Sequence, residues 1–214
     1  MRELLRSLPV FAGPLPPFDA RRVPASPVEL FTAWLQAAIA AGAPEPHAVT
    51  LSTVDGEGRP DARVLILKDV EESGWSFASS AVSAKGRQLT AASQAALSAY
   101  WPAQGRQVRI RGEVGEVGRA DSGRDFLARS SGARAMALLS RQSQVLTAPG
   151  GVETALAAAA QRLAADPDLV APDWTLYRLV AQEVEFWQAT ASRRHTRLRY
   201  RREGQEWRRE QLWP

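Results

Sequence analysis

The chain of 214 residues is long enough for one full hydrophobic core, and its composition, 45% hydrophobic and 23% charged, is that of an ordinary globular protein. It contains no cysteine and only two histidines, so disulfides, thiolate chemistry and a histidine-rich zinc site are excluded and no metal is expected. No apolar run reaches about 18 residues, and Met1–Pro9 lacks the apolar segment of a secretory signal, so no membrane partner is predicted and a cytoplasmic protein is expected. The net charge of +4 is carried mostly by arginine, which gives little support for a nucleic-acid partner.

The elements expected along the chain change in type near residue 48. Five prolines predict an extended arm over residues 1–25, and Ser26, Pro27 and Glu29 indicate the start of a helix that ends at Gly42. The expected strands are 48–54, 61–68, 75–79, 96–101, 107–117, 176–187, 197–201 and 206–212, and the later helices are 83–93, 122–130, 133–141 and 152–165. This meander spacing predicts a mainly β fold with surrounding helices (α+β), an antiparallel barrel or sandwich in one domain of residues 26–214.

The strand from Arg63 to Lys68 has a cation at each end of four apolar residues. Because side chains alternate in a strand, residues 63, 65 and 67 share one side and residues 64, 66 and 68 the other. The pattern fits a site for a flat anionic molecule, and it equally fits a buried central strand whose charged ends reach solvent.

A second candidate segment runs from Ser79 to Gly86. A strand that leads into a helix start with serine hydroxyls and Lys85 offers phosphate its backbone N–H groups, the positive helix end and a cation. An ordinary serine-capped helix has the same local pattern.

The third candidate segment combines Trp187 with the arginines around His195. Trp187 can offer an aromatic face or an indole donor, and Arg193, His195 and Arg197 share one face if the chain is extended. The alternatives are a structural tryptophan beside a solvated basic strand, and a nucleic-acid groove, although aromatic residues are not interleaved through the basic run. Gln107, Gln142 and Ser143 are uncharged groups able to read the edge of a heterocycle, but single residues of this kind usually lie on the surface.

Taken together, these segments resemble the FMN-dependent pyridoxamine/pyridoxine 5′-phosphate oxidase family, in order and spacing and without gaps. The resemblance covers most of the chain, from the helix at Ser26 to Pro214. The segments that carry it are Arg63-Val64-Leu65-Ile66-Leu67-Lys68, Gly105-Arg106-Gln107-Val108, Ser140-Arg141-Gln142-Ser143, and Val184-Glu185-Phe186-Trp187-Gln188 with Arg193-x-His195-x-Arg197.

The resemblance implies a split β-barrel homodimer with two FMN molecules at the subunit interface. The residues implied to hold FMN from one subunit are Arg63, Val64, Leu65, Ile66, Leu67, Lys68, Ala78, Ser79 and Lys85, with Arg63, Ser79 and Lys85 on its phosphate. Those implied to close over it from the other subunit are Gln107, Gln142, Ser143, Trp187 and Arg197.

The implied reaction moves a hydride from the C4′ carbon of a phosphorylated pyridine to the flavin, and O2 then reoxidises the flavin and yields H2O2. Arg193 and His195 would be the catalytic pair that clamps the pyridine ring. The matching positions for the substrate phosphate are Lys68, Asp125, Arg129 and Ala133.

Four of the matched positions depart from the family pattern. Asp125 stands where a tyrosine is usual and would repel a phosphate, and Ala133 replaces a serine; Arg124 or Ser130 could compensate if the helix shifted register. Ala84 replaces an arginine and Ala78 a tyrosine near the FMN phosphate. These departures keep other readings open: an FMN oxidase with a different substrate resembling a phenazine precursor, a non-catalytic flavin-binding protein, or an arginine-rich nucleic-acid binder.

Overall fold

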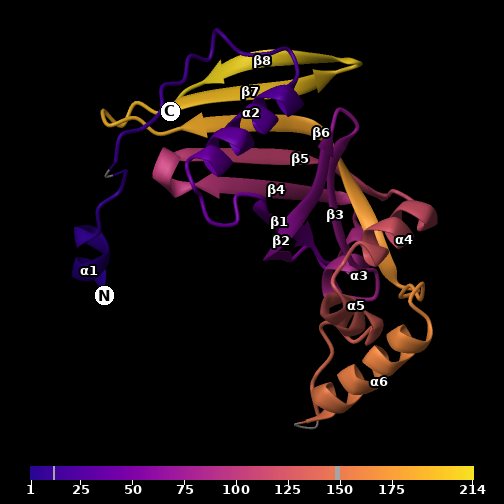
Figure 1. The fold of residues 1–214 in the computed structure, drawn as a ribbon. Helices are drawn as coiled ribbons and strands as arrows, with labels where there is room; N and C mark the ends of the chain where they lie inside the picture. The colour runs from indigo at the N-terminus through magenta and orange to yellow at the C-terminus, as the bar shows by residue number, and fades with distance from the viewer. Residues whose placement is uncertain (12, 148–149) are drawn as a thin grey trace.

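The fold is a closed antiparallel barrel extended by a hairpin, in a computed structural model that describes residues 1–11, 13–147 and 150–214. The sheet order is β3-β2-β1-β4-β5-β6-β7-β8, and a further pairing of β3 with β6 closes the first six of these strands (Figure 1). The strands are β1 (Ala48–Val54), β2 (Pro60–Glu71), β3 (Gly74–Ser80), β4 (Gln94–Trp101), β5 (Arg106–Glu116), β6 (Trp174–Gln188), β7 (Thr196–Glu203) and β8 (Glu206–Leu212). The predicted mainly β, antiparallel barrel with surrounding helices is confirmed.

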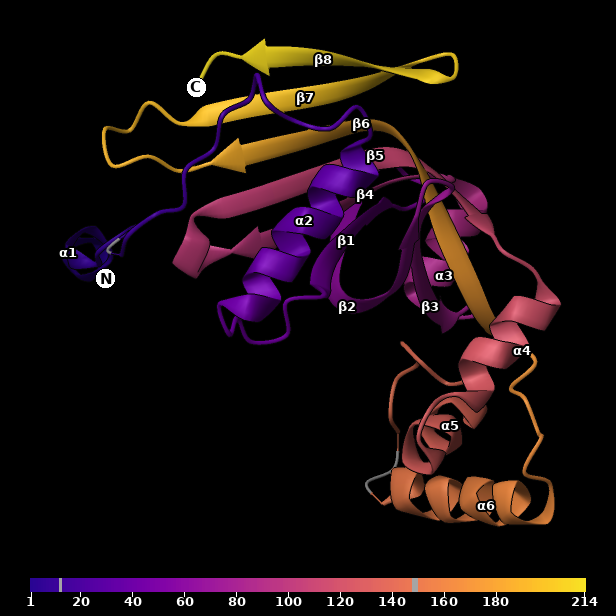
Figure 2. The ribbon, with the colours of Figure 1, turned by 45° about the horizontal axis from the view of Figure 1, so that its top comes forward.

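Helix α2 (Pro27–Ala40) covers the barrel and starts as the sequence predicts. Ser26 is the N-cap, and its hydroxyl accepts a hydrogen bond from the Val28 backbone at 3.1 Å. Phe31 and Trp34 are buried, and the Trp34 ring lies 5.2 Å from that of Phe186 on β6. Burial of two large aromatic side chains against the strands therefore fixes this helix on the sheet (Figure 2).

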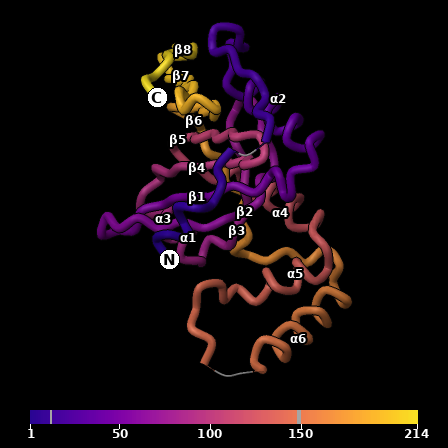
Figure 3. Tube along the Cα trace, turned by 90° about the vertical axis from the view of Figure 1, so that its left-hand side faces the viewer, coloured from indigo at the N-terminus to yellow at the C-terminus, as the bar shows by residue number. Residues whose placement is uncertain are grey.

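Helices α4 (Arg119–Leu127), α5 (Ser131–Leu138) and α6 (Gly151–Ala165) gather at one end of the barrel and form a small second core. Helix α3 (Ala84–Ala91) contributes Leu89 to the main core instead, and a short 3-10 turn, η1 (Pro102–Gln104), joins β4 to β5. Phe126, Leu138 and Leu163 are buried together, while α6 lies farthest from the sheet (Figure 3). None of the helices in the described ranges is long and apolar enough to cross a membrane.

The N-terminal arm is not extended throughout, because Arg2–Ser7 forms helix α1, ahead of Pro9. No residue of α1 is buried. Further along the arm, Phe18 packs edge-on against Trp34, and Phe11 lies 5.7 Å from the ring of Trp187. Residue 12 of the expected arm lies outside the described residues.

Strand β6 connects the two ends of the molecule. It has 15 residues, starts beside the helical end and finishes beside η1 and β7 (Figure 1). At ~3.3 Å per residue, Trp174 and Trp187 are separated by roughly 40 Å along the strand. Features carried by its two ends are therefore far apart within one chain.

Candidate active site

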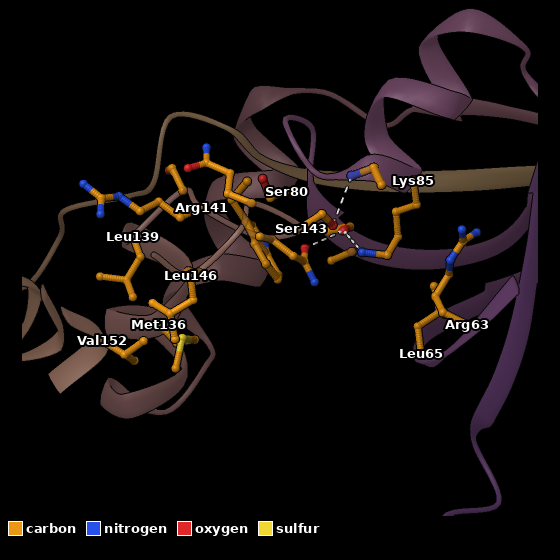
Figure 4. A pocket seen from close by; sticks show the side chains of 18 of the residues that line it. Arg63, Leu65, Ser80, Lys85, Met136, Leu139, Arg141, Ser143, Leu146 and Val152 are labelled. Atoms are coloured by element: carbon orange, nitrogen blue, oxygen red, sulfur yellow. Dashed lines mark hydrogen bonds between the residues drawn. The ribbon is translucent and has the colours of Figure 1, made fainter. Parts of the chain in front are cut away.

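A cavity of about 940 Å3 lies between the barrel and the helical end, and β2, β3 and α3 form its polar wall. Lys85 and Arg63 point into this region from α3 and β2 (Figure 4). The Lys85 Nζ donates to the Ser79 hydroxyl at 3.0 Å, and the Arg63 guanidinium donates to Gln88 at 3.1 Å and pairs with Asp61. The predicted grouping of Arg63, Ser79 and Lys85 is therefore present in one chain.

The start of α3 belongs to the same wall. The Ser83 hydroxyl caps the helix by accepting from the Gly86 backbone at 3.2 Å, and the Ala84 backbone N–H donates to the Ser143 hydroxyl at 3.3 Å. A Cβ atom at position 86 would lie 2.2 Å from the Ala81 carbonyl oxygen, so the close approach of helix and strand requires glycine. Backbone donors and the positive end of a helix thus stand beside two cations.

The environment of Lys85 disfavours its own charge. Burial, and then repulsion from Arg63, lower the pKa of Lys85 below its ordinary value, and the carboxylate of Asp61 opposes this only in part. An anion placed beside Lys85 would relieve this penalty. The chain has only two lysines, Lys68 and Lys85, and both lie at predicted site positions.

The opposite wall of the cavity is apolar and comes from the helical end. Met136 and Val152, on α5 and α6, and Leu139 and Leu146, in the connection between these helices, line it (Figure 4). Leu146 is 65% exposed and Met136 51% exposed, so this surface is uncovered in a single chain. The cavity therefore offers a cationic side and an apolar side to one occupant.

Gln142 and Ser143 lie in this same cavity. The Gln142 side chain is 3.5 Å from the Ser79 hydroxyl, and Ser143 contacts Ala84 as described above. The expected division, with Gln142 and Ser143 supplied by the other subunit, stays a prediction; within the single chain the segment after α5 folds back onto the exit of β3 and makes these contacts. Ala78 also lines the cavity.

The predicted strand residues 63–68 divide between four environments. Val64 and Leu65 line the cavity together with Arg63, whereas Leu67 is buried in the main core. Ile66 is partly buried in β2, outside the cavity lining. The pairing of β2 with β3 shifts register between Leu67 and Asp69, so Lys68 sits at a bulge, a feature that redirects a side chain.

Lys68 meets Asp125 of α4. Its Nζ lies 3.4 Å from the Asp125 Oδ1, and the Trp174 indole N–H donates to the other carboxylate oxygen at 2.8 Å. The Arg129 guanidinium carbon stacks 4.1 Å from the centre of the Trp174 ring, and both side chains line the cavity. Burial lowers the pKa of Arg129, and the Asp125 carboxylate partly offsets this effect.

Ala133, one of the departures at the expected phosphate position, and the two residues suggested to compensate can now be placed. Ala133 contributes only backbone: its carbonyl oxygen accepts from Arg129 at 3.3 Å. Arg124 pairs with Asp121, and the Ser130 hydroxyl caps α5. Both side chains have local partners, so these contacts give no support to the suggested compensation by Arg124 or Ser130, which stays a prediction.

A second group of predicted residues forms one row across three strands. Gln107 on β5 is the register partner of Trp187 on β6, and Trp187 is in turn the register partner of Arg197 on β7. Directly paired residues in an antiparallel sheet project from the same face. The structure therefore brings Gln107, Trp187 and Arg197 together as predicted.

The turn between β6 and β7 adds the predicted catalytic pair to this row. The His195 ring lies 4.7 Å from that of Trp187, and its Nδ1 accepts from the Thr190 backbone N–H at 3.2 Å. A neutral His195 therefore carries its proton on Nε2, where it can donate to a ligand. Arg193 has a φ of 62° and its backbone N–H donates to the Thr190 carbonyl at 3.0 Å, which shapes the turn.

Glu185 and Trp174 contact predicted site residues, and sequence reasoning missed both. Glu185 is 4% exposed; it accepts from Arg197 at 2.8 Å and also pairs with Arg109. Burial would raise the pKa of Glu185, but the hydrogen bonds from Arg197 and Arg109 outweigh it and hold the pKa below its ordinary value. Glu185 could have been predicted to lie near the row, because it stands two residues before Trp187 and therefore on the same face of the strand.

The cavity and the Trp187 row lie at opposite ends of strand β6. Trp174 at the start of β6 lines the cavity, whereas Trp187 near its end belongs to the row with Gln107 and Arg197. The roughly 40 Å length of this strand exceeds the span of any small molecule. In the described part of the chain, no three His, Cys, Asp or Glu side chains are placed to hold a metal ion.

Comparison with known families agrees with this arrangement over most of the chain. Residues 35–163 match the family model described as pyridoxamine 5′-phosphate oxidase. Residues 174–214, which contain β6, β7 and β8, match the model of the pyridoxine 5′-phosphate oxidase C-terminal dimerisation region.

Individual relatives cover the chain almost completely. It is 42% identical over 195 residues to pyridoxine/pyridoxamine 5′-phosphate oxidase of Ectopseudomonas mendocina, covering 90% of this chain and 91% of that protein. The Azotobacter vinelandii protein of the same name is 43% identical, with coverage of 89% and 90%. Among solved structures, the chain is similar to PhzG from Burkholderia lata 383, which was solved in complex with tetrahydrophenazine-1-carboxylic acid. The TM-score is 0.85 and the identity 32%, and the match covers 94% of this chain and 100% of PhzG. The chain belongs to the pyridoxamine 5′-phosphate oxidase family.

Proposed function

We propose that the protein is an FMN-dependent oxidase that converts pyridoxamine or pyridoxine 5′-phosphate to pyridoxal 5′-phosphate, with O2 reduced to H2O2. The enzyme class and the cofactor follow from its family. The observation that carries the proposal is the pair of half-sites, one built to hold an anion and one built to hold an aromatic ring.

The residues of the cavity fit FMN. Lys85, Arg63 and Ser79 beside the start of α3 offer its phosphate two cations, a hydroxyl and a helix N-terminus. The cavity volume of about 940 Å3 lies within the range of cofactor sites, and the apolar side can pack against a ring system. The lowered pKa of Lys85 favours an anionic occupant for the reason given above.

Bound FMN supplies the redox chemistry, accepting two electrons from the substrate and passing them to O2. The protein supplies orientation and charge. His195, with its proton on Nε2, donates a hydrogen bond to the pyridine substituents, and Arg193 holds the ring over the cofactor. Trp187 packs against His195 and excludes water from this side.

A second copy of the chain completes each site. One chain cannot close its own Trp187 row over its own cavity, because β6 separates them. Twofold symmetry lets the Trp187 row of one subunit meet the cavity of the other, twice per dimer. The match of residues 174–214 to a dimerisation region supports this arrangement.

A second candidate function keeps FMN but changes the substrate. The ion pair between Lys68 and Asp125 favours it, since one of the two cations expected for a substrate phosphate is already engaged. An aromatic carboxylate, like that bound by the B. lata relative, is the class of alternative substrate.

A mixing experiment tests both the activity and the composite site. Wild-type protein should be yellow, bind one FMN per chain and release peroxide with pyridoxamine 5′-phosphate. Chains that lack both phosphate cations (Arg63→Met with Lys85→Met) and Arg193→Ala chains, each nearly inactive alone, should regain about a quarter of wild-type activity after random reassortment into dimers, because half of the dimers contain one intact composite site. Colourless protein that takes up no FMN would refute the function, and absence of rescue between mixed chains would refute the shared site.

A further inference from the structure

Resting on the FMN oxidase activity of the proposed function, and favouring its second candidate substrate over the first, we infer that Asp125 is a specificity-determining residue: by engaging Lys68 it selects a substrate whose remote group carries one negative charge, such as a carboxylate, over a phosphate dianion.

The Asp125 side chain is fixed in place rather than free to swing aside. It is 13% exposed, the Trp174 indole N–H holds one carboxylate oxygen at 2.8 Å, and Lys68 lies 3.4 Å from the other. The two contacts come from β6 and β2, two different strands of the barrel. Rotation of the carboxylate away from a ligand would break both contacts at once.

The local charge matches a monoanion. Lys68 and Arg129 contribute two positive charges and Asp125 one negative charge, which leaves a net charge of about +1. A phosphate monoester carries close to two negative charges at neutral pH. It would compete with Asp125 for Lys68 and meet like-charge repulsion, whereas a carboxylate would balance the site.

The cluster of Lys68, Asp125, Arg129 and Trp174 reaches the cavity through two of its four members. Arg129 and Trp174 line it, and the Arg129 Nε is buried without a hydrogen-bond partner among the described residues. A buried donor without a partner carries a free-energy penalty that a bound acceptor can remove. Arg129 therefore remains available to a ligand after Lys68 is engaged.

The decisive variant is Asp125→Asn, which removes the charge and keeps an oxygen that can accept from Trp174. The measurement is calorimetric binding to the FMN-loaded dimer of two non-reactive pyridines: 4-deoxypyridoxine 5′-phosphate, and its analogue with a carboxylate in place of the phosphate. The wild type should prefer the carboxylate. The Asp125→Asn variant should bind the phosphate ligand about tenfold more tightly than the wild type does, because one like charge has been removed. Its affinity for the carboxylate ligand should rise by less.

Asp121→Asn is the matched control, because Asp121 lies on the same helix one turn earlier and pairs with Arg124 instead. It should leave both affinities unchanged. Adding Lys68→Met to Asp125→Asn should abolish most of the gain for phosphate, since the freed lysine produces it.

Equal changes for both ligands, or no change in a dimer that has retained FMN, would overturn this role of Asp125 while leaving the oxidase intact. A wild type that binds phosphate more tightly than carboxylate would overturn it as well. Failure of the wild type to bind FMN would instead count against the proposed function.

Discussion

The two half-sites hold their cations in different ways. In the cavity, Lys85 is bonded to a neutral hydroxyl of Ser79, and its pKa is lowered by burial and then by repulsion from Arg63. In the Trp187 row, Arg197 is bound to the buried carboxylate of Glu185. The difference teaches that the cavity keeps the charge of Lys85 available for an anion, whereas the Trp187 row, like the pair of Arg63 with Asp61, uses charge to fix geometry.

Among the variants that test this comparison, Glu185→Gln should have the largest effect, a loss of folding stability. Glu185→Gln leaves Arg197 and Arg109 without their shared carboxylate, and loss of a buried partner should lower the free energy of unfolding by about 3 kcal/mol. Urea unfolding measures this change. Because the pKa of Glu185 is held below its ordinary value of 4.5, its stabilisation is present above that pH and is lost as the pH falls through the lowered pKa. The variant and the wild type should therefore converge in acid.

Glu183→Gln is the control for this variant. Glu183 lies on the same face of β6, is 20% exposed and forms longer ion pairs with Arg111 and Arg199, at 3.7 Å and 3.5 Å. Its loss should be smaller, about 1 kcal/mol or less, as for exposed pairs. Equal losses for both variants would show that Arg197 is not held specifically by Glu185.

Arg193→Ala tests whether the Trp187 half acts on the substrate rather than on the cofactor. Turnover should fall about 100-fold because the ring is no longer positioned, while the flavin absorbance stays with the protein. Arg194→Ala removes the same charge from the adjacent exposed residue and should leave turnover nearly unchanged. Simultaneous loss of FMN from the Arg193 variant would assign Arg193 to cofactor binding instead.

The smallest effect should be a pH dependence of FMN affinity carried by Lys85. Since its pKa lies below the ordinary 10.5, the lysine loses its proton at lower pH than usual, and FMN affinity should fall several-fold as the pH rises through the lowered pKa. Fluorescence titration of FMN between about pH 7 and pH 10 measures it. Lys85→Arg should flatten the profile, because a guanidinium stays charged. A profile as steep in this variant as in the wild type would exclude Lys85 as its source.

Local patterns predicted the elements and the groupings that are close in sequence. Ser26 and Pro27 placed the start of α2, and the segment from Ser79 to Gly86 predicted a strand leading into a helix start, which the structure has, with Lys85 donating to Ser79 at 3.0 Å. These predictions succeed because hydrogen bonds within a few residues determine them. The grouping of Gln107, Trp187 and Arg197 was predicted from the family resemblance alone, because the local sequence of one strand does not determine its register with a strand distant in sequence.

The contacts that tertiary packing decides could not be predicted. Lys68 and Asp125 are brought together by a bulge in β2 and by the position of α4, neither of which has a local signal. Gln142 was expected from the other subunit, but the fold-back of the segment after α5 places it beside Ser79. The proline-rich composition of the arm also concealed α1, which ends before Pro9.

The length of β6 makes the activity of the enzyme depend on dimer formation. On the proposed arrangement an isolated chain holds two unmatched halves and no complete site, so activity per chain should drop on dilution below the dissociation constant of the dimer. Molecules that separate the subunits would then inhibit the enzyme without resembling its substrate or entering its cavity.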